Sequence, residues 1–163
     1  MTNTENEDKK IYIRAAGVMI KDDKVLLQKP EIDDLWCLPG GSVEHMERSE
    51  DTLEREFFEE SGIKIKIERL LWVVENFFEY DEKKAHEVGL YYLVKPIDSE
   101  EKVQMKEFIG KEEFYHPEKH GTFELLFRWF TKEELKNIRL LPKFLPEALQ
   151  NIPEYTEHIY TTG

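Results

Sequence analysis

Three glutamates lie within five residues in the stretch REFFEESG, residues 55–62. On a helix Glu56, Glu59 and Glu60 share one face, where each like-charged pair costs roughly 0.2–0.5 kcal/mol. Two interpretations are open: a solvated face that screens the repulsion, or a site that holds a cation between the carboxylates. Taken alone, an E-x-x-E-E pattern in an acidic chain favours the solvated face.

The helix that carries these carboxylates places them beside the expected core. The pattern predicts a helix over residues 49–61, with Ser49 as its N-cap and Gly62 just past its end. At about 100° per residue, Leu53 and Phe57 form the buried stripe, and the glutamates cover the adjoining arc. Carboxylates at such a half-buried boundary are poorly screened, and hard divalent cations relieve their repulsion. The geometry therefore favours a metal site.

A longer pattern surrounds the glutamates. Residues 41–63 satisfy G-x5-E-x7-R-E-U-x-E-E-x-G-U, where U is a bulky apolar residue. The fixed positions are Gly41, Glu47, Arg55, Glu56, Phe57, Glu59, Glu60, Gly62 and Ile63. This pattern resembles the signature of the Nudix hydrolase superfamily, and WCLPGG just before it is similar to that family's usual lead-in. One position departs: Met46 stands where the family has glycine, and methionine takes a positive φ only at a cost.

The resemblance implies a reaction and a metal. We expect hydrolysis of the pyrophosphate bond in a nucleoside diphosphate linked to another moiety, with Mg²⁺ or Mn²⁺ as cofactor. The implied metal ligands are the main-chain carbonyl of Gly40 and the carboxylates of Glu56, Glu59 and Glu60. Glu56 and Glu59 are also the implied catalytic residues, together with Arg55 and Glu47. In relatives the residues at the positions of Arg55 and Glu47 form an ion pair that ties the loop to the helix. A pair between Arg55 and Glu59 within the helix is the second possibility.

The general base and the substrate contacts are less defined. In relatives the general base is the glutamate at the position of Glu56 or of Glu59, or a glutamate in a distant loop. The distant candidates in this chain are Glu87, Glu112, Glu113 and Glu124. The candidate substrate-binding residues are Arg14, Trp36 and Tyr80. Arg14 interrupts an apolar strand and so could line a pocket. Trp36 could stand at the rim of that pocket. Tyr80 follows the motif at a spacing similar to that of a tyrosine in diadenosine polyphosphate hydrolases of the superfamily. The structural alternatives are a salt bridge at the sheet edge for Arg14, a core position for Trp36 and a hairpin end for Tyr80.

Composition limits the partners. The net charge of −12, from 35 acidic and 23 basic residues, disfavours nucleic acid and anionic membranes as partners. It permits an anionic substrate that is bound through metal ions. No apolar run approaches the roughly 20 residues of a membrane span, the polar start is unlike a secretory signal, and Cys37 is the single cysteine. We therefore expect a cytoplasmic enzyme that acts on a small nucleotide. Many relatives form homodimers, so the resemblance makes a homodimer one option for its assembly. The alternatives are a Nudix-fold nucleotide sensor without hydrolysis and an RNA 5′-end pyrophosphohydrolase.

The remaining elements predict one domain. We expect a disordered tail over residues 1–9 and a single Nudix domain over 10–163. Strand patterns occupy residues 11–20, 24–29, 63–80, 86–95 and 122–130, and short helices are predicted from Thr131 and over 142–151. The charged stretch 99–121 is typical of a long loop. The fold class is α/β (α+β), with a mixed β-sheet sandwiched between helices (α/β/α), as in the Nudix fold.

Overall fold

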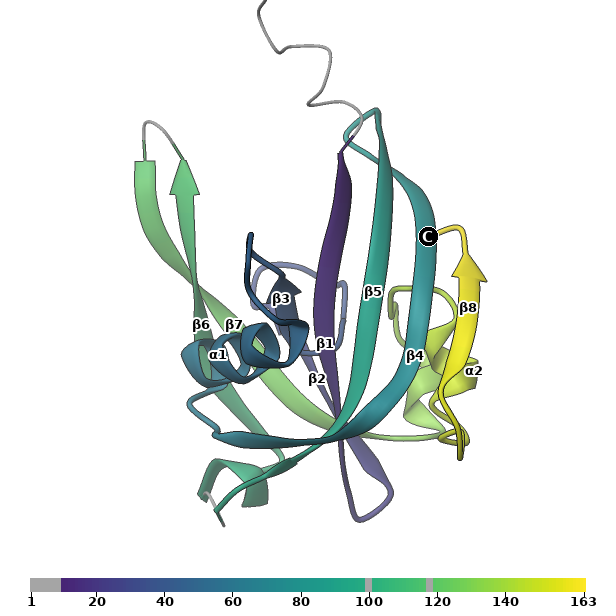
Figure 1. Ribbon diagram of the computed structural model, residues 1–163. Helices are drawn as coiled ribbons and strands as arrows, with labels where there is room; N and C mark the ends of the chain where they lie inside the picture. Colours follow the sequence, from purple (N-terminus) through teal and green to yellow (C-terminus); the bar gives the residue numbers. More distant parts are fainter. Residues whose placement is uncertain (1–9, 99–100, 117–118) are drawn as a thin grey trace, which may run out of the picture.

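The computed structural model describes residues 10–98, 101–116 and 119–163 (Figure 1). The predicted tail, residues 1–9, lies outside the described residues. The elements follow in chain order. They are β1 (Ile11–Lys21), β2 (Lys24–Pro30), β3 (Gly40–Ser42), α1 (Ser49–Ser61), β4 (Ile65–Tyr80), β5 (Lys83–Pro96), the 3-10 helix η3 (Glu101–Gln104), β6 (Glu107–His116), β7 (Lys119–Thr131), the 3-10 helix η4 (Glu134–Asn137), α2 (Leu145–Ala148) and β8 (Glu157–Thr161).

The strands form one mixed sheet, as predicted. Within the described chain its order is β6-β7-β2-β1-β5-β4-β8, with β3 paired to the remaining part of β1. The pairs β1–β5 and β4–β8 are parallel, and the others are antiparallel. β1 therefore lies at the centre of the sheet. It pairs with β5 along one side and with β2 and β3 along the other.

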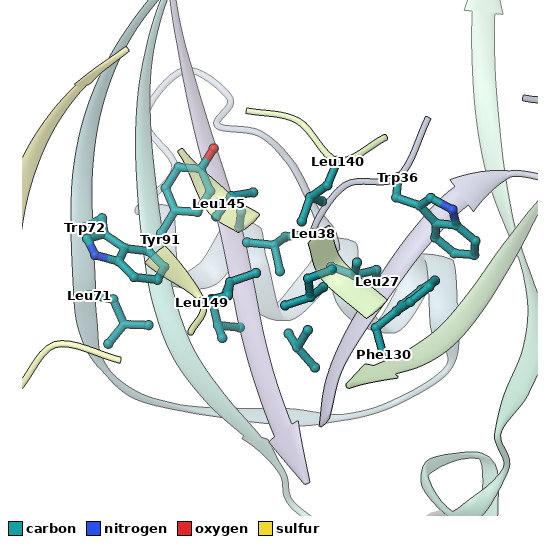
Figure 2. Packing of buried hydrophobic residues seen from close by; sticks show 14 of the residues in the cluster. Leu27, Trp36, Leu38, Leu71, Trp72, Tyr91, Phe130, Leu140, Leu145 and Leu149 are labelled. Atoms are coloured by element: carbon teal, nitrogen blue, oxygen red, sulfur yellow. The ribbon is translucent and has the colours of Figure 1, made fainter. Parts of the chain in front are cut away.

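Alternate residues of β1 enter two separate cores, because successive side chains of a strand point to opposite faces. Ala15 and Met19 pack with Leu53 and Phe57 of α1. Ala16 and Val18 belong to the other core, which includes Trp72, Tyr91, Leu145 and Leu149 (Figure 2). Helical segments thus cover both faces of the sheet, and the predicted sandwich is confirmed.

The helix α1 spans the predicted residues. Gly62 takes φ 78° and its N–H donates to the carbonyl of Phe58, which ends the helix as expected. The predicted N-cap is wrong: Arg48 occupies that position without a side-chain cap bond, and Ser49 is the first helical residue. The Ser49 hydroxyl instead lies 2.7 Å from the Tyr92 hydroxyl of β5, so it ties the start of the helix to the sheet.

Two other sequence predictions are corrected. Most of the stretch 99–121, predicted as a loop, forms η3, β6 and the start of β7, while residues 99–100 and 117–118 lie outside the described chain. β6 pairs along its whole length with β7. The helix predicted from Thr131 is only the 3-10 turn η4, although Thr131 and Glu134 exchange both bonds of the expected capping box. Among the described helices, none has the length and apolar character needed to span a membrane.

Candidate metal and catalytic site

The motif carboxylates open into one cleft between α1 and β6. The cleft has a volume of about 490 Å³. Its lining residues are Glu44, Arg55, Glu56, Glu59, Glu60, Lys111, Glu112 and Glu113. α1 supplies one wall because Leu53 and Phe57 are fully buried against the sheet and orient the adjoining helix face. The structure thus brings together the three predicted carboxylate ligands.

Two glycines let β3 pass directly beneath this helix. A Cβ on Gly40 would lie 2.0 Å from the Ala15 carbonyl oxygen, and one on Gly41 would lie 2.5 Å from the Glu56 carboxyl carbon. Such separations exclude any side chain unless the backbone or Glu56 moves. The main chain of β3 therefore lies against a motif glutamate, as a Gly40 carbonyl ligand would require. That ligand role stays a prediction.

An ion pair ties the loop before α1 to the helix. Arg55 Nε and Nη2 each lie 3.0 Å from one carboxylate oxygen of Glu47. Thr52 also donates its hydroxyl proton to that carboxylate. The Arg55 and Thr52 hydrogen bonds lower the pKa of Glu47 to about 2. This two-pronged pair fixes the direction of the guanidinium, so Arg55 pairs first with Glu47, as expected.

The third guanidinium nitrogen points into the cleft. Arg55 Nη1 lies 2.9 Å from Glu56 Oε1 and 3.4 Å from Glu59 Oε2. Within the described chain no three His, Cys, Asp or Glu side chains form a ready cluster for a metal ion. The motif carboxylates share the cleft, but two of them are turned toward Arg55. Side-chain rotation of Glu56 and Glu59 is needed to bring their oxygens onto a common cation.

Glu60 fits a cation site most clearly. Its side chain is only 4% exposed, and its Oε2 is buried without a hydrogen-bond partner in the described structure. Burial, followed by the charges of Glu112 and Glu56, raises the pKa of Glu60 to about 9. A buried carboxylate oxygen without a donor is costly, and a divalent cation with oxygen ligands supplies the missing partner. The donor set therefore suits Mg²⁺ or Mn²⁺.

The three predicted substrate contacts lie in different places. Arg14 is half-buried, donates to the Leu38 carbonyl at 3.1 Å and interacts electrostatically with Glu60, but it is not among the residues that line the cleft. Trp36 is buried in the core, with its ring centroid 4.7 Å from that of Phe130. Tyr80 is 76% exposed and lines a separate pocket at the end of β4. For these three residues, substrate binding stays a prediction.

The candidate general bases also lie in different places relative to the motif cleft. Glu112 and Glu113 of β6 line the motif cleft, whereas Glu87 lies beside Arg14 and Glu124 bonds to Glu31. Sequence reasoning did not single out Lys111 or Glu44, which also line the cleft. The stretch EFIGKEEFYH of β6 has no regular alternation, and its aromatic and β-branched residues were the available signal for a strand there.

Met46 keeps the backbone conformation that glycine favours. Its φ is 64° and its side chain is 90% exposed in the loop before Glu47. The loop therefore retains its turn despite the substitution, with the strain of a left-handed residue.

Comparison with known proteins places this fold and site in a family. The NUDIX domain model matches residues 11–152, so the chain belongs to the Nudix family. The predicted enzyme class, hydrolases that act on pyrophosphate bonds, is confirmed at the level of the family. Hydrolases of this family generally use divalent metals.

Two relatives match a shorter region. Diphosphoinositol polyphosphate phosphohydrolase 3-alpha of Mus musculus is 33% identical over 73 residues, which are 45% of this chain and 42% of that protein. Diphosphoinositol polyphosphate phosphohydrolase 2 of Rattus norvegicus is 34% identical over 73 residues, 45% of this chain and 38% of that protein. The match thus spans less than half of the length of these relatives.

Solved structures agree on the fold. A UDP-X diphosphatase has a TM-score of 0.62 and 20% identity, covering 92% of this chain and 67% of that one. An ADP-ribose pyrophosphatase from Streptococcus suis has a TM-score of 0.57 and 16% identity, covering 91% and 98%. At these identities the likeness shows the fold alone.

Proposed function

We propose that this protein hydrolyses the pyrophosphate bond of a small substrate, a nucleoside diphosphate linked to another moiety, with Mg²⁺ or Mn²⁺ as cofactor. One observation carries the proposal: Glu56, Glu59 and Glu60 meet in a single cleft, and the innermost has a buried oxygen without a partner. The names of the similar proteins, a phosphohydrolase, a diphosphatase and a pyrophosphatase, support this reaction class. They differ in the moiety named, so they leave the substrate open within that class.

The metal would be held by the Gly40 carbonyl and the carboxylates of Glu56, Glu59 and Glu60. A divalent ion bound there neutralises the polyphosphate and lowers the pKa of bound water. Glu60 anchors the site from its buried position, where ionisation is favoured only beside a cation. Arg55 is held by Glu47 on two nitrogens, so it stays in place when Glu56 and Glu59 turn toward the cleft.

Glu112 is the candidate base that the geometry favours. It is half-buried on β6, lines the motif cleft, and interacts electrostatically with Arg14 and Glu56. Burial raises the pKa of Glu112, which makes its carboxylate a better proton acceptor. We assign it the proton of the attacking water. Arg14, which interacts electrostatically with Glu60 and Glu112, would bind a substrate phosphate that extends away from the glutamates.

A substrate panel tests the proposal. Phosphate release is measured with nucleoside triphosphates, oxidised nucleotides, ADP-ribose, dinucleoside polyphosphates, nucleotide sugars, CoA and a diphosphoinositol polyphosphate. Each is assayed with Mg²⁺, with Mn²⁺ and with EDTA. We expect metal-dependent cleavage of at least one compound. Tight nucleotide binding with no cleavage under any condition would instead support the sensor alternative.

A further inference from the structure

The hairpin end of β4 and β5 lies beside the start of β1 (Figure 1). Residues at this end of the three strands line a second pocket. Its volume is about 570 Å³, within the ordinary range for a small-ligand pocket. We call it the lysine–aromatic pocket, after Lys10, Lys83, Lys84, Tyr12, Phe78 and Tyr80, which line it. The motif does not reach it, and the reaction proposed above does not use these side chains.

The charge of this pocket is opposite to that of the molecule. Its three lysines face only two acidic lining residues, Asp81 and Glu87, in a chain of net charge −12. Across the described residues, no salt bridge involves any of the three lysines. Lysine ammonium groups grouped without carboxylate partners attract anions and bind phosphate as point charges.

The aromatic side chains add a surface for a ring. Tyr12 is 44% exposed, Tyr80 is exposed, and Phe78 is half-buried between the strands. Tyr12, Phe78 and Tyr80 line the same pocket from β1 and β4, so they offer apolar faces next to the lysines. Large exposed aromatic groups contribute contact area when a ring packs on them. Lysine and aromatic groups together fit a ring that carries phosphate.

Arg14 interacts electrostatically with one residue of each site, although it lines neither. On β1 it follows Tyr12 by two residues, so both side chains lie on one face, about 7 Å apart along the strand. Arg14 interacts electrostatically with Glu60 on the cleft side and with Glu87 on the pocket side. Ser42, which lines the pocket, pairs with Arg14 and directly follows the two glycines of β3. A substrate that contacts both sites would therefore pass Arg14.

We propose that the lysine–aromatic pocket binds a phosphate-bearing ring in the second moiety of the substrate. The substrate would then carry at least one phosphate group away from the pyrophosphate bond that is cleaved. This inference rests on the proposed function for the position of the cleaved bond. The affinity of the pocket for a phosphorylated ring does not depend on hydrolysis.

The test measures binding to the metal-free full chain in EDTA, by calorimetry. The probes are adenosine 3′,5′-bisphosphate and inositol hexakisphosphate, which carry phosphates on a ring without a pyrophosphate bond, and adenosine, which carries none. The test variant is Lys83→Gln/Lys84→Gln. Its matched control is Lys66→Gln/Lys136→Gln, which removes the same charge from exposed positions outside both clefts. Lys83→Arg/Lys84→Arg keeps the charge, and thermal melting checks the fold of every variant.

We expect the test variant to bind at least one phosphorylated probe about tenfold more weakly, which corresponds to about 1.4 kcal/mol. The control and the arginine variant should stay within about twofold of wild type. Equal losses in the test and control variants would overturn the proposal, because bulk charge would then explain binding. So would adenosine binding as tightly as its bisphosphate, or no binding of either phosphorylated probe.

The same assay separates this inference from the proposed function. Glu59→Gln should bind the phosphorylated probes as wild type does, because Glu59 lies in the other cleft. If the panel shows no hydrolysis but binding still depends on Lys83 and Lys84, the proposed reaction is wrong and the phosphate pocket stands. If hydrolysis occurs and the lysine substitutions leave probe binding unchanged, only the pocket assignment is wrong.

Discussion

The motif cleft and the lysine–aromatic pocket lie along one sheet but carry opposite charge. Six glutamates, with Arg55 and Lys111, line the first, while three lysines and two acidic residues line the second. An anionic substrate would meet mainly positive charge in the pocket, whereas in the cleft it would need bound cations to offset the glutamates. The proposed function and the proposed pocket together would let an acidic protein bind a phosphorylated compound at both ends.

The two sites also differ in how firmly they are built. In the cleft, Glu60 is buried and Glu47 is held by Arg55 and Thr52, so charge is fixed by packing and hydrogen bonds. In the pocket, Tyr80 and the lysines lie exposed near a hairpin turn. Substitutions in the cleft should therefore alter both rate and stability, whereas those in the pocket should alter affinity alone.

The largest expected effect comes from Glu59→Gln. Removing one predicted metal ligand should lower the hydrolysis rate by about 10²-fold or more, the scale seen when one charge-stabilising group is lost from an active site. The matched control is Glu54→Gln on the exposed side of the same helix, which should keep the wild-type rate. Steady-state kinetics on the best panel substrate measures both. Equal cleavage by wild type and Glu59→Gln would show that the site assignment is wrong.

Arg55→Lys should have the next largest effect. Lysine keeps the positive charge but cannot make the two-pronged contact with Glu47 and the third bond to Glu56 at once. We expect a loss of about 10–100-fold in kcat, as for groups that orient metal ligands. Circular dichroism should show an intact fold. A rate within twofold of wild type would mean that Arg55 does not position the glutamates.

Glu60→Gln separates charge from packing in the cleft. The folded pKa of Glu60, about 9, lies above its ordinary 4.5. Its contribution to stability is thus complete below pH 4.5 and is lost as pH rises through 9. In EDTA at pH 8–9, Glu60→Gln should be more stable than wild type by about 1–3 kcal/mol, because the wild-type carboxylate must take up a proton or be buried as a charge on folding and the amide need do neither.

Urea unfolding with and without Mn²⁺ checks this expectation. Adding Mn²⁺ should stabilise wild type more than Glu60→Gln, since only the carboxylate becomes an anionic ligand. Glu54→Gln serves as the control and should leave the pH dependence unchanged. A variant less stable than wild type at pH 8–9 in EDTA would contradict the role given to the buried carboxylate.

The smallest expected effect is that of Met46→Gly. The left-handed φ of 64° costs a methionine about 1–2 kcal/mol, part of which is offset by the larger backbone entropy of glycine when unfolded. The net expectation is a gain of about 0.5–1 kcal/mol in the free energy of unfolding. His45→Gly, at a neighbouring position without a positive φ, should lower it. Destabilisation by both changes would remove the case for strain at Met46.

The sequence predicted the cleft better than the pocket for physical reasons. The α1 boundaries and the buried stripe follow from local spacing, because a helix fixes which side chains share a face. The Arg55–Glu47 pair was expected from the resemblance to the Nudix motif, since Glu47 lies before the helix. The N-cap was missed because Ser49 bonds to Tyr92, a distant contact that no local pattern contains.

Long-range pairing explains the other misses. β6 and the start of β7 resemble a charged loop because their sequence is rich in lysine and glutamate, and their pairing with each other makes them strands. The short edge strand β8 gave no periodic signal and depends on β4 for its hydrogen bonds. The lysine–aromatic pocket is formed by residues from β1, β4 and β5, so only the sheet register brings its side chains together.

The most direct test of the metal site is the anomalous signal of Mn²⁺ in crystals of the full chain soaked with that ion. We predict a peak bounded by the carboxylates of Glu56, Glu59 and Glu60 and the Gly40 carbonyl, with oxygens at about 2.0–2.3 Å as hard cations require. Crystals that diffract well, show no peak in this cleft and keep Glu56 and Glu59 turned toward Arg55 would contradict it.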